Sequence, residues 1–181
     1  MIQVHDLQFV PYLSAEQIQS KVHQLGAAIS QDYKGKQPLF ISILNGAFIF
    51  AADLVRACEL DCEIAFTQLS SYEGTSSTGK VKLKIPLTTA VEGRDVVIVE
   101  DIVDTGRTLH YFMEYLQSLK PASIALAALL VKPTAIEYPV KVDYAGFEIP
   151  NKFVVGYGLD YNDLGRNLAD IYQLASADTS A

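Results

Sequence analysis

Apolar residues recur along the chain in two spacings, one helical and one typical of strands, and the two alternate. Behind Ser14-Ala15-Glu16-Gln17, which reads as a capping box, come Ile18, Val22, Leu25 and Ile29 at intervals of three or four residues. This spacing puts the four side chains on one face of a helix. The pattern therefore predicts a first amphipathic helix.

The next apolar run, residues 38–44, is continuous and has the length of a buried strand. Asn45-Gly46 interrupts it, and residues 48–58 then lack strand alternation and are rich in helix formers. We predict strand, turn and helix here. Asn-Gly between two apolar runs is also a strong hairpin signal, so a β-hairpin stays open as the alternative.

Residues 63–69 read as a further strand, and residues 70–79 are small and polar without periodicity, which predicts a mobile loop. After the loop, Val81, Leu83 and Ile85 alternate with lysines. Such alternation is typical of a half-exposed strand. Strands should therefore flank the loop on both sides.

Residues 96–99 form a wholly apolar strand that we expect to end where a group of acidic residues begins. A helix over 107–119 should stop at Lys120-Pro121, and buried strands are predicted over 123–131 and 153–157. Strands that alternate with helices predict an α/β fold with a mostly parallel sheet flanked by helices.

Composition supports a single α/β domain over residues 1–181, because half of the residues are apolar. The formal net charge is −7, with no basic run, which argues against a nucleic-acid-binding surface. The chain lacks an apolar stretch of membrane-spanning length and a recognisable leader at its start. We therefore expect a cytoplasmic protein without a membrane partner.

Cys58 and Cys62 lie four residues apart and could in principle supply two metal ligands. Two ligands do not complete a zinc site, and the three histidines, His5, His23 and His110, are far apart in the sequence. We interpret the cysteines as reduced thiols with a packing role.

The turn after the 96–99 strand is suited to a phosphate. Gly106 allows a positive φ, Thr105 and Thr108 offer hydroxyl donors, and Arg107 adds positive charge. The helix that begins near Arg107 points its free N–H groups at the same place.

Three carboxylates, Glu100, Asp101 and Asp104, accompany this phosphate turn and must face something neutral or cationic. A sugar diol offers two donors to an ionised carboxylate, and a divalent cation takes carboxylate ligands. The alternative is a solvated acidic loop that caps a helix.

Residues 96–109 resemble the phosphoribosyl-diphosphate-binding signature of the type I phosphoribosyltransferases, and residues 144–162 resemble the purine-recognition region of the hypoxanthine-guanine phosphoribosyltransferases. The resemblance extends from about Leu39 to Asp170. It implies the type I phosphoribosyltransferase fold, with a small hood built from the chain ends. The implied reaction transfers a phosphoribosyl group to a 6-oxopurine, hypoxanthine and also guanine.

For the sugar side, the resemblance implies that Glu100 and Asp101 hold the ribose hydroxyls directly or through Mg²⁺. The turn from Asp104 to Thr108 would cradle the 5′-phosphate, and Asp104 would handle the proton on purine N7. Asp160 would bind a second magnesium ion or lie near the base. Arg166 would meet the diphosphate oxygens. The alternative for Asp160 and Arg166 is a pair of solvated surface charges.

For the base, the resemblance implies that Lys132 donates to the exocyclic oxygen of the 6-oxopurine, which would exclude adenine. Phe153 would stack on the ring, and the Val154 backbone would read its edge. The alternatives are a surface lysine at a strand end and a core phenylalanine.

Ser71 and Tyr72 match the family's lid, with Gly74 and Gly79 as candidate hinges; a plain surface connection is the alternative. One position departs from the family, because Leu44-Asn45-Gly46 stands where Leu-Lys-Gly is common. We keep the backbone role of Asn45 and Gly46 at the diphosphate, without the lysine charge. Relatives usually form dimers or tetramers. The competing function is a phosphoribosyl-diphosphate-sensing regulator that binds RNA or DNA.

Overall fold

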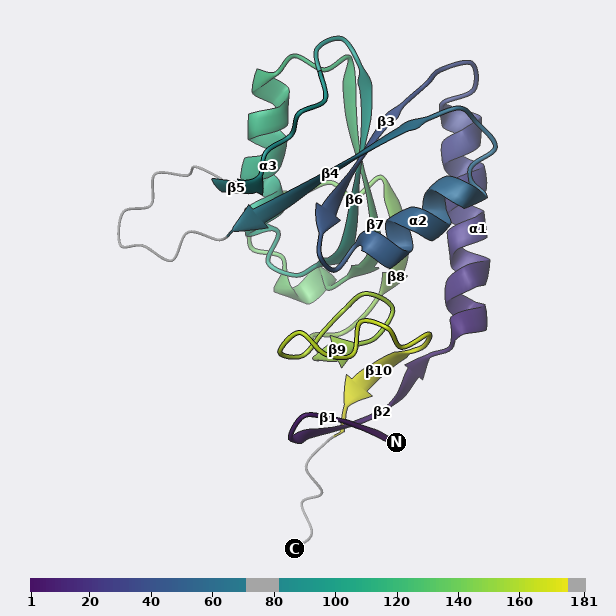
Figure 1. Ribbon diagram of the computed structural model, residues 1–181, viewed down its shortest axis with the longest axis vertical. Coiled ribbons are helices and arrows are strands. Elements are labelled where there is room, and N and C mark those ends of the chain that lie inside the picture. Colours follow the sequence, from purple (N-terminus) through teal and green to yellow (C-terminus); the bar gives the residue numbers. More distant parts are fainter. Residues whose placement is uncertain (71–81, 176–181) are drawn as a thin grey trace, which may run out of the picture.

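A six-stranded sheet forms the larger part of the molecule, shown in Figure 1 as a computed structural model that describes residues 1–70 and 82–175. Five neighbouring strands are parallel and β5, at one edge, is antiparallel to β4. The strand order is β5-β4-β3-β6-β7-β8. The strands are β3 (Leu39–Leu44), β4 (Glu63–Ser70), β5 (Lys82–Ile85), β6 (Asp95–Val103), β7 (Ser123–Val131) and β8 (Tyr144–Glu148).

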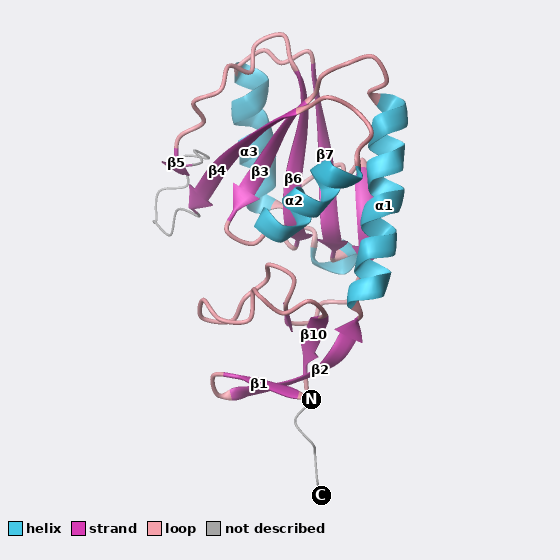
Figure 2. Ribbon diagram, turned by 45° about the vertical axis from the view of Figure 1, so that its right-hand side comes forward, coloured by secondary structure: helices cyan, strands magenta, loops and turns pink. Residues whose placement is uncertain are grey.

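Helices cover both faces of this sheet (Figure 2). α1 (Ala15–Asp32) and α2 (Phe48–Ala57) pack on one face, and α3 (Arg107–Ser118) packs on the other. The central strands are buried on both faces, which explains their nearly unbroken apolar sequences. A short 3₁₀ turn, η1 (Pro133–Ala135), follows β7.

The first helix begins as its sequence predicts. The Ser14 hydroxyl accepts a hydrogen bond from the Gln17 N–H at 3.3 Å, and the Gln17 side chain accepts one from the Ser14 N–H at 2.9 Å. This reciprocal pair is a capping box, and Ile18, Val22 and Leu25 face the core behind it.

Most of the predicted core elements are confirmed, with three corrections. The hairpin alternative at residues 45–46 is wrong, because β3 and α2 flank that turn. β6 does not end where the acids begin but runs on to Val103, because Ile102 and Val103 still pair with β7. The strand predicted over 153–157 shrinks to β9 (Val154–Val155), because positive φ angles at residues 156 and 157 end it.

A second, four-stranded sheet joins the two ends of the chain (Figure 1). Its order is β1 (Ile2–Val4), β2 (Leu7–Leu13), β10 (Ile171–Leu174) and β9, and every pairing is antiparallel. It has a small core of its own around Val4, Phe9 and Val155. We call this sheet, with the loop 156–170 that connects β9 to β10, the hood.

Among the described residues, no helix has the length and apolar character needed to span a membrane. Cys58 and Cys62 are free thiols that lie partly buried against the core. This agrees with the packing role that the sequence predicts.

Candidate active site

Three neighbouring strands of the sheet end at the edge that faces the hood (Figure 2). β3 leads into Asn45-Gly46, β6 leads into Asp104, and β7 leads into Lys132. Ligands of open α/β sheets bind outside the carboxyl ends of the strands. The topology thus brings together candidate residues that lie far apart in the sequence.

The turn between β6 and α3 has the conformation that its sequence predicts. Gly106 adopts a φ of +78° and precedes the first residue of α3. The Arg107 N–H donates to the Thr105 hydroxyl at 3.4 Å, and the N-cap residue, Gly106, has no side chain to cap the helix. A cavity of about 120 Å³ opens here. It is lined by Glu100, Ile102, Asp104, Thr105, Gly106, Arg107, Thr108 and Leu109.

A loop behind the turn holds it in place, and sequence reasoning missed this support. The N–H groups of Glu137 and Tyr138 donate to the Thr105 carbonyl oxygen at 3.0 and 3.1 Å. A Cβ at residue 106 would lie 3.1 Å from both the Tyr138 carbonyl oxygen and a methyl group of Val140. The turn thus needs glycine for space as well as for its φ.

The two acids within β6 are partly buried and share their electrostatic environment. Burial and the neighbouring Asp101 charge raise the pKa of Glu100 well above its usual range. Burial raises the pKa of Asp101 to about 6, although the Ile102 N–H and the Arg166 charge act in the opposite direction. Glu100 Oε2 is buried without a hydrogen-bond partner among the described residues. An unpartnered buried carboxylate oxygen is a position that a ligand can fill.

Gly46 lies close both to Asp101 of the core and to Gly158 of the hood. A Cβ at residue 46 would collide with Oδ2 of Asp101, and a Cβ at residue 158 would collide with the carbonyl oxygen of Gly46. Gly158 also has a φ of +102°. The turn after β3 therefore packs backbone against the acids and against the hood.

Lys132 and Asp104 form an ion pair, with Nζ 2.7 Å from Oδ2. The Lys132 side chain is 8% exposed and that of Asp104 is 48% exposed. The alternative of a surface lysine is therefore wrong. The buried ammonium extends from the end of one strand to the carboxylate at the end of the next, with the phosphate turn beside it.

Asp160 and Arg166 are partners rather than separate surface charges. Arg166 Nη2 lies 2.7 Å from Asp160 Oδ1, and Arg166 Nη1 donates to the Gly158 carbonyl oxygen at 2.8 Å. The Asp163 N–H donates a hydrogen bond to the other carboxylate oxygen of Asp160 at 2.8 Å. The hood loop is therefore held by its own ion pair, with Arg166 close enough to act on Asp101.

Phe153 is 43% exposed, so the alternative of a core phenylalanine is wrong. Its ring lies edge-on to Tyr161, with 5.7 Å between centroids, and 6.1 Å from the ring of Phe9. Val154 beside it is 5% exposed and pairs with β10. The structure thus offers a partly exposed aromatic ring directly before strand β9.

Two further predictions concern the lid and the turn after β3. Ser71, Tyr72, Gly74 and Gly79 lie outside the described residues, as does most of the predicted loop. Asn45 is exposed. No three His, Cys, Asp or Glu side chains of residues 1–70 and 82–175 are arranged to hold a metal ion.

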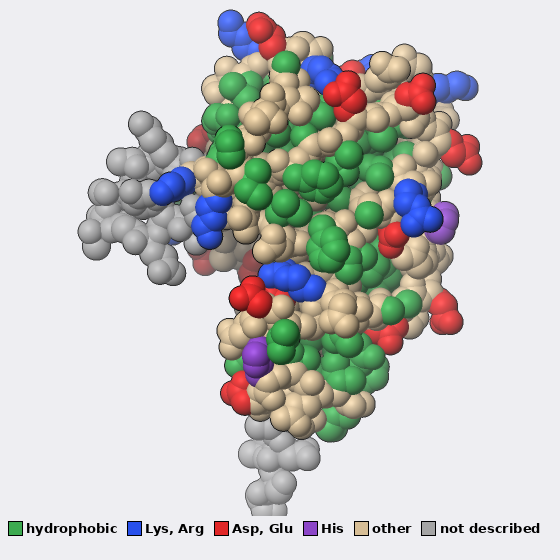
Figure 3. Space-filling view, viewed as in Figure 1, with side chains coloured by type: hydrophobic (Ala, Val, Ile, Leu, Met, Phe, Trp, Pro, Cys, Tyr) green, Lys and Arg blue, Asp and Glu red, His purple; other side chains and the backbone are tan. Residues whose placement is uncertain are grey.

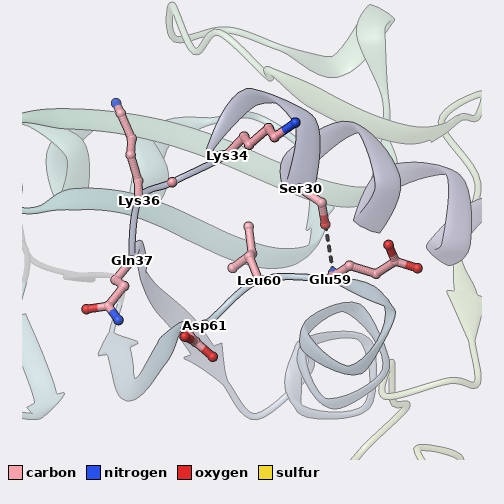
Figure 4. Close-up of a pocket in the computed structure, with 8 residues that line it drawn as sticks. Ser30, Lys34, Lys36, Gln37, Glu59, Leu60 and Asp61 are labelled. Carbon is pink, nitrogen blue, oxygen red and sulfur yellow. Dashed lines mark hydrogen bonds between the residues drawn. The ribbon is translucent and has the colours of Figure 1, made fainter.

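A larger cavity, of about 490 Å³, lies at the opposite edge of the sheet, beside the segments that lead into β3 and β4 (Figure 4). The charged side chains that line it are exposed, and the Glu59 N–H donates to the Ser30 hydroxyl within it. It lacks the buried acids and the ion pair of the carboxyl edge. Chemistry rather than volume therefore points to the smaller cavity.

A glycine turn at a helix start, partly buried acids and a basic residue at the carboxyl edge of a parallel sheet are the class features of α/β proteins that bind phosphorylated ligands. The family model of the phosphoribosyl transferase domain matches residues 12–162. A hypoxanthine-guanine phosphoribosyltransferase from Bacillus subtilis is 45% identical over 174 residues, which are 96% of each chain. One from Lactococcus lactis is 46% identical over 157 residues, 86% of this chain and 85% of that one.

A crystal structure of a hypoxanthine phosphoribosyltransferase from Staphylococcus aureus superposes with a TM-score of 0.88 at 42% identity. The match covers 94% of this chain and 92% of that one. The chain therefore belongs to the phosphoribosyl transferase family, among the hypoxanthine-guanine phosphoribosyltransferases. The relatives named here are enzymes and give no support to the regulator alternative.

Proposed function

We propose that the protein is a purine-salvage enzyme that transfers the 5-phosphoribosyl group of phosphoribosyl diphosphate to N9 of hypoxanthine, and of guanine. The products are the purine nucleoside monophosphate and diphosphate. The observation that carries this proposal is the Lys132–Asp104 ion pair at 2.7 Å beside the phosphate turn. In this proposal, the ion pair combines a cation that binds the base with a carboxylate that accepts a proton, next to a phosphate site at the same edge of the sheet.

In the reaction, purine N9 forms a bond to the anomeric carbon while the bond from that carbon to diphosphate breaks. The transition state has oxocarbenium character, so alignment of the two substrates and stabilisation of the departing diphosphate supply most of the acceleration. The turn from Thr105 to Thr108 would fix the 5′-phosphate with hydroxyls, N–H groups and the Arg107 charge. The hood would hold the base opposite it.

Asp104 would accept the N7 proton of the base, and Lys132 would donate to the exocyclic oxygen. Lys132 extends to Asp104 already, so a bound 6-oxopurine would share the ammonium with that carboxylate. An adenine amino group would place a donor against the lysine, which has no acceptor to offer. A site built to hydrogen-bond one group discriminates strongly against its opposite. Phe153 would cover the ring and Val154 would read its edge.

Glu100 and Asp101 would hold the ribose hydroxyls and Mg²⁺. Their carboxylates suit magnesium, and the unpartnered Glu100 Oε2 offers a free ligand atom. Magnesium usually combines one or two carboxylates with substrate oxygens, which fits a site where three protein ligands do not converge among the described residues. The ion would supply charge neutralisation to the diphosphate. Asp160 would bind Mg²⁺ only after its ion pair with Arg166 opens. The Arg166 guanidinium would then be free to bind the diphosphate.

Exposed apolar side chains on α2 and β4 support an assembly of two or more copies of this chain. Phe48 on α2 is 43% exposed, and Ile64 and Phe66 on β4 are 40% and 44% exposed. Hydrophobic side chains gather in the middle of the face shown in Figure 3. We expect a homodimer or homotetramer that covers them. Sedimentation of wild type and Phe66→Ser tests this, since an unchanged oligomer would place the interface elsewhere.

The proposed activity is tested by nucleotide formation with phosphoribosyl diphosphate, Mg²⁺ and hypoxanthine, guanine or adenine in separate reactions. Rapid product with hypoxanthine and guanine and none with adenine is the expected result. Product from adenine at a comparable rate would contradict the role of Lys132. No product with any base, together with tight phosphoribosyl-diphosphate binding, would favour a sensor instead of an enzyme.

A further inference from the structure

One tyrosine of the hood has its side chain in the core of the larger sheet. Tyr157 follows β9, is 4% exposed, and belongs to the buried cluster that contains Ile18 of α1 and Leu54 of α2. Its hydroxyl donates to Oδ2 of Asp53 on α2 at 2.7 Å. Gln19 of α1 donates to the same oxygen at 2.7 Å. Asp53 thus links the hood to two helices of the core.

The hydrogen bond to Asp53 is well suited to hold a position. Burial, followed by the bond to Asp53 and its charge, raises the pKa of the Tyr157 hydroxyl far above its ordinary value. The hydroxyl therefore remains a donor throughout the physiological pH range. Hydrogen bonds to a carboxylate are shorter and stronger than those between neutral groups.

One end of this hydrogen bond lies beside the hood half of the proposed site, and the other lies beside the core half. On the hood side, Val154 lies three residues before Tyr157, and Gly158 after it contacts the carbonyl oxygen of Gly46. On the core side, Asp53 lies on α2, which begins two residues after Gly46. The link therefore spans from the base-reading strand to the helix behind the diphosphate turn.

A second contact keeps the hood against α1. Asp170 Oδ1 accepts from the Ala15 N–H, the first residue of α1, at 2.7 Å. This bond lies at the start of the helix, whereas Gln19 and Asp53 lie one turn further along the core. Val154, Leu159 and Ile171 of the hood also pack in the core cluster, and the Tyr157 hydrogen bond adds a directed contact to this packing.

We propose that Tyr157 and Asp53 are a positioning pair that holds the purine-reading strand of the hood at a set distance from the phosphoribosyl site of the core. This inference rests on the proposed function. Neither side chain touches a substrate; the pair acts through Val154 on one side and Gly46 on the other. Because a displacement of about 1 Å between reacting groups can cost about 10²-fold in rate, loss of the link should appear in catalysis.

The test compares Tyr157→Phe with Tyr144→Phe. The Tyr144 hydroxyl donates to Asp32 at 2.8 Å between β8 and α1, so the control loses a more exposed tyrosine–carboxylate bond within the core. For Tyr157→Phe we expect kcat to fall about tenfold to a hundredfold and the KM for hypoxanthine to rise. The Kd of phosphoribosyl diphosphate with Mg²⁺, measured without base, should stay within about twofold, because the core holds that substrate.

A merely stabilising role would lower the melting temperature of both variants and leave kcat and the KM for hypoxanthine at 25 °C unchanged in Tyr157→Phe. That result would overturn the inference. A second variant pair checks the mechanism: the double variant Tyr157→Phe/Asp53→Asn should be no slower than the slower single variant, because both changes act on one bond. Additive losses would also overturn it.

The two proposals fail in different ways. If the wild-type protein forms no nucleotide, the proposed function is wrong, and this inference falls with it. If wild type is active and Tyr157→Phe matches it in kcat and in KM for hypoxanthine, only the positioning pair is wrong.

Discussion

The turn after β6 in the core and strand β9 in the hood, to which we assign phosphate and base binding, teach different lessons about how a site is encoded. The turn from Asp104 to Thr108 is one contiguous segment whose φ angles, hydroxyls and helix start follow from local sequence. The hood is assembled from β1, β2, β9 and β10, and β2 and β10 pair across about 160 residues of chain. The core should therefore govern phosphoribosyl diphosphate, and the hood should govern the base.

The largest expected effect is at Asp104, where the two halves meet. Asp104→Asn keeps the shape but removes the proton acceptor, so kcat should fall about 10²- to 10⁴-fold. Steady-state kinetics with hypoxanthine measure this, with the Kd of phosphoribosyl diphosphate as the control. Near-normal turnover would remove Asp104 from the mechanism.

Replacement of Lys132 by alanine tests whether this residue selects hypoxanthine over adenine. Without the ammonium, the ratio of kcat/KM for hypoxanthine to that for adenine should fall about a hundredfold, or about 2.7 kcal/mol. The matched control is Lys141→Ala, because the Lys141 side chain is 83% exposed and pairs only with Asp143 among the described residues. If the ratio is unaltered in Lys132→Ala, discrimination resides elsewhere.

Gly106 and Gly35 provide a matched pair of backbone tests, with φ angles of +78° and +77°. An alanine at either position suffers similar backbone strain, of about 1–2 kcal/mol. Only the Cβ at residue 106 would meet close neighbours, whereas at residue 35 none of the described atoms lies within 4 Å. Gly106→Ala should therefore raise the KM for phosphoribosyl diphosphate about tenfold, and Gly35→Ala should leave it unchanged. Equal KM values in both variants would contradict the phosphate role.

The buried acids predict how stability depends on pH. A carboxyl whose pKa is raised in the folded state stabilises that state fully below the unfolded pKa, near 4.5 for Glu100, and loses this contribution as pH rises through the folded pKa. Glu100→Gln should therefore be more stable than wild type at pH 8, but not at pH 4. Urea unfolding with a chelator present measures this difference. A variant that is less stable than wild type at pH 8 would contradict the burial cost.

The smallest effect is expected at Asn45, which stands where the family commonly has lysine. Asn45→Lys adds a charge at an exposed position beside Gly46, so the inhibition constant for diphosphate should fall only a few-fold, roughly 1 kcal/mol. An unchanged constant would mean that residue 45 points away from the diphosphate.

Local structure can be predicted from this sequence where the residues that cause a feature are neighbours in the chain. The Ser14–Gln17 capping box and the αL conformation of Gly106 were both predictable because the residues concerned are neighbours. The extension of β6 to Val103 was missed, since it depends on pairing with β7. So was the bond between Tyr157 and Asp53, which are 104 residues apart.

The site residues show the same division. That Lys132 follows a buried strand is evident from sequence, but its 2.7 Å contact with Asp104 requires the parallel register of β6 and β7. Likewise, the support of Thr105 by the Glu137 and Tyr138 N–H groups involves a loop without periodicity. Backbone groups carry no sequence identity, so no residue pattern could have indicated this contact.

The most direct test of the central claim is a crossed measurement of two KM values in two variants. Thr108→Val removes a hydroxyl from the cavity beside the turn of the core. Phe153→Leu removes the hood ring that we propose to cover the base. We predict that Thr108→Val raises the KM for phosphoribosyl diphosphate about tenfold with little change for hypoxanthine, and that Phe153→Leu does the reverse. If each variant raised both KM values equally, the division of labour between core and hood would be contradicted.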